Sequence, residues 1–303
     1  MTKNLLVMAD LGPADVSAIL DLAERAVPPR VLEGKGAALV FEHPSARTRN
    51  AAEMAVVRLG GHPVTIRGEE IGFDTRESVE DVAMTLACFH ALIGARVASH
   101  STLLRIADSL RQHGRAVPTV NLLSDLEHPS QALADLLTIR QCFGKIEGRS
   151  VAFIGDGNNV ARSLAYGCAL SGAAFRIASP AGYELSDDDL AGVRKLGGEI
   201  ERYGRPEDAA AGADVLYTDV WVSMGEEAAG AAKRAAFAGY TLDERLLSLA
   251  ETDAVVLHCL PAHRGEEVSA AVLDGPASRI WQQAENRMYA LVGACAHLLG
   301  ATT

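Results

Sequence analysis

The sequence has no excess of positive charge, and this absence bears first on its partners. It holds 28 lysines and arginines against 39 aspartates and glutamates, so its formal net charge is −11 at pH 7. A net negative charge opposes nonspecific binding to nucleic acid and to anionic lipid. We therefore expect no nucleic-acid partner, and an anionic ligand must meet a local cluster of arginines.

Long apolar runs and paired cysteines are also missing. No apolar stretch reaches the roughly 20 residues that a membrane-spanning helix needs, and the apolar N-terminal stretch, interrupted at Asp10, is too short for a secretion signal. The five cysteines are widely spaced and form no Cys-x-x-Cys pair, which argues against a disulfide framework and against a zinc site. We expect no membrane partner and a reducing, cytoplasmic location.

What is present is the composition of an ordinary globular protein. Hydrophobic residues make up 49% of the 303 residues and charged residues 22%, which fits neither a disordered chain nor a fibrous repeat. At roughly 150 residues per domain, the length predicts two domains, each able to bury its own core.

Short aliphatic runs alternate with helical patterns along the whole chain. Strands are predicted at 37–41, 63–66, 91–95 and 117–122 in the first half, and at 150–154, 174–178, 214–218 and 254–258 in the second. Helices are predicted between them, among others at 45–59, 129–143 and 279–299. Such alternation is typical of parallel sheets. We predict an α/β fold with two doubly wound parallel-sheet domains, 1–143 and 144–278, and a C-terminal helix, 279–303, that packs back on the first domain.

The first candidate site follows the strand at 37–41. Ligands of doubly wound sheets bind beyond the carboxyl ends of the strands. Ser45 is placed there as a helix N-cap, where free backbone N–H groups and the helix dipole attract an anion. Arg47, Thr48 and, after the strand at 91–95, Arg96 add donors suited to a phosphate. The alternative is a capped helix with solvated arginines, and this segment alone does not decide between the two.

Further polar residues follow other strands. His128 precedes Pro129, which suits the first position of a helix, so His128 and Gln131 are expected to face the same crevice. The segment Asp219–Gly225 offers a carboxylate, a hydroxyl and apolar surface, a set that favours an amino acid ligand, with a buried tryptophan loop as the alternative. Cys259 ends the last strand, where a cysteine is as often packed inertly as it is part of a site.

Two cofactor interpretations are weak. Gly155–Val160 follows a strand and opens a helix as in dinucleotide-binding proteins, but Val160 replaces the third glycine and no ribose-binding acid follows the next strand. His258, Cys259 and His263 are close in sequence, but Pro261 interrupts them and the chain has no helical pair of histidines four residues apart. We expect neither a nicotinamide cofactor nor a bound metal.

Together these segments make the chain resemble the aspartate/ornithine carbamoyltransferase family over essentially its full length. Ser45–Arg49 is similar to the family's Ser-Thr-Arg-Thr-Arg loop, His128–Gln131 to its His-Pro-x-Gln motif and Ala284–Arg287 to its C-terminal Glu-Asn-Arg. Three further segments are most similar to the ornithine members of the family: Asn158–Asn159, Asp219–Gly225 and His258–Pro261.

The resemblance implies transfer of a carbamoyl group from carbamoyl phosphate to the δ-amine of L-ornithine, without metal or cofactor. It also implies a cytoplasmic homotrimer of arginine biosynthesis. The residues implied for carbamoyl phosphate binding are Ser45, Ala46, Arg47, Thr48, Arg96, His128, Gln131, Cys259, Leu260 and Arg287. Among these, a catalytic role is implied for Arg47, Arg96, His128 and Cys259. The residues implied for ornithine binding are Asn159, Asp219, Ser223 and Met224.

The sequence departs from the family pattern at several positions. Ala46 stands where a threonine or glycine is usual, and Gly72 or Phe73 stands where a histidine or glutamine is expected before Glu77. These departures leave two alternatives open: a carbamoyltransferase for a different amine or amino acid, and a binding paralogue impaired in catalysis.

Overall fold

The computed structural model describes residues 3–222 and 230–302. The chain forms two compact units, the first made of Met1–Ala134 and Glu285–Thr303 and the second of Asp135–Ala284. The division falls inside two helices, α6 (Pro129–Phe143) and α13 (Ile280–Leu298). The sequence places its boundaries at the ends of these helices, because a glycine such as Gly144 marks where a helix stops and does not show which core each turn of it joins.

The first unit is built on a four-stranded parallel sheet in the order β2-β1-β3-β4. Its strands are β1 (Gly36–Phe41), β2 (His62–Arg67), β3 (His90–Arg96) and β4 (Thr119–Leu123). Its helices, besides the parts of α6 and α13 that belong to it, are η1 (Met8–Asp10), α1 (Pro13–Ala23), α2 (Ala46–Arg58), α3 (Gly68–Ile71), α4 (Val79–Phe89) and α5 (His100–Gln112). Because the strands are parallel, the residues that follow β1, β3 and β4 emerge at one edge of the sheet.

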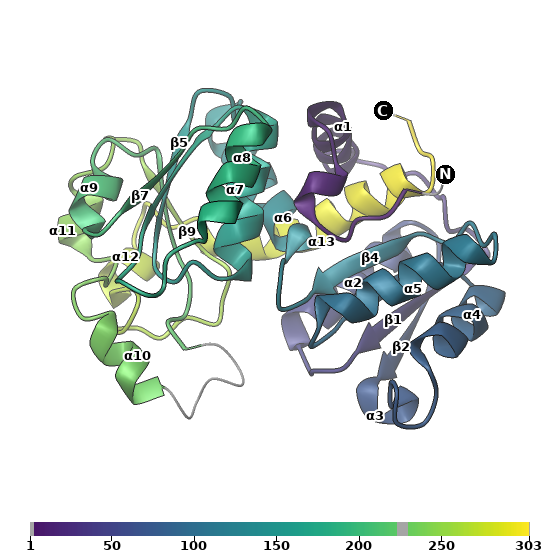
Figure 1. Cartoon of the computed structure of the whole chain (residues 1–303). Helices are drawn as coiled ribbons and strands as arrows, with labels where there is room; N and C mark the ends of the chain where they lie inside the picture. Colours follow the sequence, from purple (N-terminus) through teal and green to yellow (C-terminus); the bar gives the residue numbers. More distant parts are fainter. Residues whose placement is uncertain (1–2, 223–229, 303) are drawn as a thin grey trace. The chain divides into compact units, whose positions relative to one another are not determined.

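The second unit is built on a five-stranded parallel sheet in the order β7-β6-β5-β8-β9. Its strands are β5 (Ser150–Ile154), β6 (Ala174–Ala178), β7 (Ile200–Tyr203), β8 (Val215–Thr218) and β9 (Val255–His258). Its helices are α7 (Asn159–Ser171), α8 (Asp187–Lys195), α9 (Pro206–Ala210), α10 (Gly230–Ala236), α11 (Glu244–Leu247) and α12 (Ala270–Leu273). Helices α7 and α8 lie on one face of this sheet and α9 and α11 on the other (Figure 1).

The predicted fold class is confirmed: both units are parallel α/β structures, and the last helix returns to the first unit. A Cβ on Gly293 of α13 would lie 2.1 Å from the carbonyl oxygen of Ile19 in α1, so the two helices approach closely there. One strand, β7, is not predicted from the sequence. It is an edge strand with exposed Glu201 and Arg202, so it lacks the continuous apolar run of the buried strands.

None of the described helices is long and apolar enough to cross a membrane. The cores are apolar in both units: residues of β1, β3, α4 and α5 pack together in the first, and residues of β5, β8 and β9 pack with Trp221, Phe237 and Tyr240 in the second.

Candidate active site

The start of α2 carries the first group of predicted site residues. Ser45 is the N-cap of this helix, and its Oγ accepts a hydrogen bond from the backbone N–H of Thr48 at 3.3 Å. The Ser45 hydroxyl also donates to Thr48 Oγ1 at 3.1 Å. Ala46 and Arg47 are the first two residues of the helix, and both are exposed. The N-cap predicted from the sequence is therefore present, with free N–H groups at the position where an anion is stabilised.

Three arginines from different elements gather at this helix start. Arg96 ends β3 and is buried, and Arg287 comes from the part of α13 that belongs to the first unit and is also buried. Burial first, and then the nearby charges of Arg287 and Arg47, lower the pKa of Arg96 to about 10. Among the described residues, neither Arg47 nor Arg96 forms an ion pair with a carboxylate. Such a concentration of positive charge, in a protein of net charge −11, is suited to a small multivalent anion.

Arg287 contacts both Thr48, at the start of α2, and His128, which directly precedes α6. Nη2 of Arg287 donates to Thr48 Oγ1 at 2.7 Å and lies 3.4 Å from His128 Nε2. Nδ1 of His128 lies 3.2 Å from the hydroxyl oxygen of Ser130. Four side chains from three distant parts of the sequence therefore form one buried, hydrogen-bonded group.

His128 is held in its neutral form. Complete burial, reinforced by the charges of Arg287 and Arg96, lowers its pKa well below the usual value of 6.5. A neutral imidazole can donate one hydrogen bond and accept another, so it can polarise a carbonyl oxygen without carrying a charge of its own. Gln131, in the first turn of α6, which begins directly after His128, is also buried.

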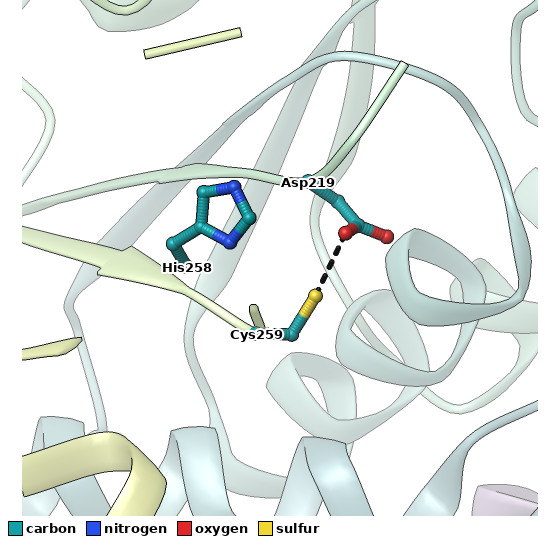
Figure 2. Close-up of side chains that lie close together, drawn as sticks. All are labelled: Asp219, His258 and Cys259. Carbon is teal, nitrogen blue, oxygen red and sulfur yellow. Dashed lines mark hydrogen bonds between the residues drawn. The ribbon is translucent and has the colours of Figure 1, made fainter. Parts of the chain in front are cut away.

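The second unit carries the other predicted residues, at the carboxyl ends of β8 and β9. Asp219 follows β8 and Cys259 follows β9, and these strands are neighbours in the sheet. The Cys259 thiol donates to Asp219 Oδ1 at 2.9 Å, which Figure 2 shows as the contact between the two side chains. The backbone N–H of Val220 donates to the same oxygen at 2.7 Å. Asp219 is thus a buried carboxylate with a fixed orientation.

Asn158, which the sequence prediction did not name for ornithine binding, contacts the predicted site residue Asp219. Its Nδ2 donates to Asp219 Oδ2 at 3.0 Å, and its Oδ1 caps α7 by accepting from the N–H groups of Val160 and Ala161. Asn159, the residue chosen from the pair Asn158–Asn159, is the first residue of α7. The sequence signal for Asn158 was its N-cap position in the short turn between β5 and α7, at the carboxyl end of the strand.

The predicted residues Ser223 and Met224 lie outside the described residues. Leu260 follows Cys259 and has a left-handed backbone with φ 61°, which is unusual for a residue other than glycine. The Leu260–Pro261 peptide bond is cis.

One departure from the family pattern has a backbone explanation. Gly72 ends α3 with φ 56°, and a Cβ there would lie 2.7 Å from Thr75 Oγ1. The left-handed backbone and the lack of space for a Cβ favour glycine over a histidine or glutamine at position 72.

Two groups of side chains place potential metal ligands within 4.8 Å of one another: Asp219, His258 and Cys259 in one, and His263, Glu266 and Glu267 in the other. In the first group both ring nitrogens of His258 are already engaged, Nδ1 with the N–H of Leu260 at 2.9 Å and Nε2 with Glu267 at 3.2 Å. A metal ion could bind this histidine only by breaking one of these contacts.

Family models match both parts of the chain. The aspartate/ornithine carbamoyltransferase carbamoyl-P binding domain matches residues 3–141, and the Asp/Orn binding domain of the same family matches residues 147–297. These matches agree with the two units of the structure. The first unit holds the three arginines at the start of α2, and the second holds Asp219.

Similar proteins cover the chain almost completely. The ornithine carbamoyltransferase of Acidothermus cellulolyticus is 45% identical over 99% of this chain and 98% of that protein. Among solved structures, ornithine carbamoyltransferase from Thermus thermophilus has a TM-score of 0.89 and 41% identity, covering 99% of both chains. Ornithine carbamoyltransferase from Pyrococcus furiosus has a TM-score of 0.92 and 37% identity, covering 100% of this chain and 98% of that one. The chain belongs to the aspartate/ornithine carbamoyltransferase family.

Proposed function

We propose that this chain is an enzyme that transfers the carbamoyl group of carbamoyl phosphate to the δ-amine of L-ornithine, giving L-citrulline and phosphate. The observation that carries the proposal is the meeting of Arg47, Arg96 and Arg287 at the N-terminus of α2, because it provides fixed positive charge without a carboxylate partner for Arg47 or Arg96 among the described residues. Asp219, held by Asn158 and Cys259 in the second unit, supplies the complementary site for an amino acid.

The first unit binds carbamoyl phosphate in this proposal. The arginines with Ser45 and Thr48 hold the phosphate and stabilise its charge as it leaves, while Arg96 and neutral His128 polarise the carbonyl oxygen, on which negative charge develops during attack. Ala46 contributes its backbone N–H at the helix start, so the missing side-chain hydroxyl removes one donor and leaves the backbone donors in place. Gln131 completes the group from α6.

The second unit binds ornithine. The δ-amine has an ordinary pKa near ~10.4, so it is almost wholly protonated at neutral pH and must lose its proton before it can attack. A carboxylate beside that amine would stabilise the charged form. We therefore assign Asp219 to the α-ammonium group, with Asn159, Ser223 and Met224 as further ornithine contacts, and Cys259 and Leu260 to the carbamoyl group.

Family membership also supports proposals about the location, pathway and assembly of the protein in the cell. We propose that it acts in the cytoplasm, in arginine biosynthesis, as a homotrimer or a multiple of trimers. Its mass in solution, measured by light scattering, tests the assembly: a mass three times, or a multiple of three times, the 31.9 kDa chain is expected.

The activity is tested by mixing the purified protein with carbamoyl phosphate and, separately, ornithine, putrescine, N-acetylornithine, lysine and aspartate. We expect phosphate release and citrulline formation with ornithine, and no phosphate release with any of the other four amines. Release with another amine would point to a different carbamoyltransferase. Carbamoyl phosphate binding without product from any amine would identify a binding paralogue.

A further inference from the structure

The turn that follows β9 holds Leu260 in a backbone conformation that leucine rarely adopts. A left-handed leucine costs of order 1–3 kcal/mol and persists only where its surroundings hold it. Here the N–H of Leu260 donates to Nδ1 of His258 at 2.9 Å, so the turn is bonded to a side chain two residues back. The His258 side chain is fully buried.

This hydrogen bond shows where the proton of His258 lies. A backbone N–H can only donate, so Nδ1 must carry a lone pair, and in the neutral ring the proton is then on Nε2. Nε2 lies 3.2 Å from Oε1 of Glu267, a carboxylate that can accept this proton's hydrogen bond. The chain of contacts runs from Glu267 through the ring of His258 to the backbone of Leu260.

Glu267 is a buried carboxylate that is held in place by hydrogen bonds. Its side chain is fully buried, and Oε1 also accepts from the backbone N–H of His263 at 2.5 Å. Burial raises the pKa of Glu267, but the hydrogen bonds from His258 and His263 outweigh burial and leave the pKa below its ordinary value. The carboxylate therefore stays ionised at neutral pH and acts only as an acceptor. Burial of an ionised carboxylate costs free energy that hydrogen bonds offset, and here Oε1 accepts two of them, from His258 and His263.

The same turn carries a residue of the candidate active site. Cys259 lies between His258 and Leu260, and its thiol donates to Asp219. The His258 backbone is fixed independently, because its N–H donates to Oε1 of Gln283 at 2.8 Å. Because the backbone at His258 is anchored, the hydrogen bond between His258 and Leu260 determines where Cys259 and Leu260 lie relative to Asp219.

We infer that Glu267 is a positioning residue for carbamoyl transfer, which fixes the Nε2–H tautomer of His258 and thereby holds Cys259 and Leu260 in place beside Asp219. Glu267 touches neither substrate in this arrangement. The inference rests on the proposed function for its catalytic consequence, whereas the tautomer itself can be measured without turnover.

The first experiment compares Glu267→Ala with Glu267→Gln. Glutamine keeps an acceptor for His258 and His263 and removes the charge, whereas alanine removes the acceptor. We expect Glu267→Ala to lower kcat about 10- to 100-fold, the usual scale for misplaced active-site groups, and Glu267→Gln to stay within about threefold of the wild type. Equal losses of activity in both variants, in parallel with equal losses of thermal stability, would assign Glu267 a structural role and overturn the inference.

The second experiment reads the tautomer directly by ¹⁵N NMR of imidazole-labelled protein, with His258 assigned from the spectrum of a His258→Gln variant. The wild type should show Nε2 protonated and Nδ1 unprotonated, and Glu267→Ala should show a mixture. A wild-type spectrum with the proton on Nδ1 contradicts the inference, whatever the activity. If the tautomer is as expected but ornithine is not carbamoylated, the proposed function fails and the positioning of the turn stands.

A matched pair at His258 keeps the test valid if Glu267→Ala does not fold. His258→Asn places an amide oxygen near the position of Nδ1, and His258→Gln places an amide near the position of Nε2. Because the hydrogen bond to Leu260 is the one that shapes the turn, His258→Asn should retain at least tenfold more kcat than His258→Gln. A higher kcat in His258→Gln than in His258→Asn would contradict the proposal that His258 shapes the turn through its hydrogen bond with Leu260.

Discussion

At the residue scale, Arg47 differs from the other arginines of the candidate site in being exposed. Arg96 and Arg287 are buried, so replacing either of them changes packing as well as charge. Arg47, at the start of α2, is exposed to solvent, so its replacement removes little packing. It is therefore the residue whose replacement best separates the proposed phosphate binding from folding.

Arg47→Ala should reduce carbamoyl transfer by a factor of about 100 to 1,000, the effect of losing one donor that stabilises a developing anion. The thermal unfolding midpoint should remain close to that of the wild type. Steady-state kinetics and a melting curve check both statements. Arg111→Ala, which removes an exposed arginine paired with Asp108 on α5, is the matched control. Unchanged turnover in Arg47→Ala would refute the phosphate assignment.

The charge of ornithine makes a second prediction at this scale. If Asp219 binds the α-ammonium and the δ-amine attacks in its neutral form, kcat/KM for ornithine should rise with pH between neutral and alkaline values. His128 adds no rise near its ordinary pKa of 6.5, because burial and the neighbouring arginines lower its pKa well below that value. Initial rates from pH 6.5 to 9.5 measure this, and a flat profile would show that proton loss from the amine is not controlling.

At the scale of elements, the return of α13 depends on a single glycine. A Cβ on Gly293 would meet two backbone atoms of α1, the oxygen of Ile19 at 2.1 Å and the nitrogen of Ala23 at 3.0 Å. Backbone atoms cannot turn aside as a flexible side chain can. The helix carries Arg287 to Thr48 at the start of α2, so its packing against α1 supports the proposed anion site from a distance.

Gly293→Ala should therefore destabilise the protein by about 1–3 kcal/mol, the usual cost of overpacking, although alanine favours a helix over glycine by about 1 kcal/mol. Chemical denaturation followed by circular dichroism measures the change. Gly204→Ala is the control, since a Cβ at Gly204 has no heavy atom within 4 Å. A stabilised Gly293→Ala variant would mean that α1 and α13 can separate at little cost.

A buried ion pair joins α10 to the turn between β5 and α7. Lys233 Nζ lies 2.6 Å from Asp156 Oδ2, and the two side chains are 5% and 14% exposed. Removing one partner of a buried ion pair destabilises a protein by about 3–5 kcal/mol. Lys233→Met should show a loss on this scale, and the double variant Lys233→Met with Asp156→Asn should be more stable than Lys233→Met alone. Calorimetric melts of the variants test this, and additive losses would show that the two groups do not interact.

At the scale of the whole molecule, the chain is acidic while its anion site is locally basic. The buried histidine in that site links stability to pH. Because the folded-state pKa of His128 is lowered from 6.5, the unfolded chain binds a proton below about pH 6.5 that the folded protein does not. The unfolded state then carries more protons, so stability falls as the pH falls.

The thermal midpoint of the wild type should accordingly fall between pH 7 and pH 5, and His128→Gln should weaken this dependence, since glutamine does not titrate. Equal slopes for the wild type and His128→Gln would mean that His128 titrates normally in the folded protein.

The sequence by itself determined the alternation of strands and helices, because the period of apolar residues is set by local backbone geometry, and it identified the motifs that place Ser45, Arg96, Asp219 and Cys259 at strand ends. It did not predict β7, whose polar edge position lacks an apolar run, and it did not show that Asn158 bonds to Asp219. Only the tertiary structure decided which distant side chains meet. The contacts of Arg287 with Thr48 and of Glu267 with His258 depend on how helices and turns pack, and no local pattern encodes the protonation of a buried imidazole.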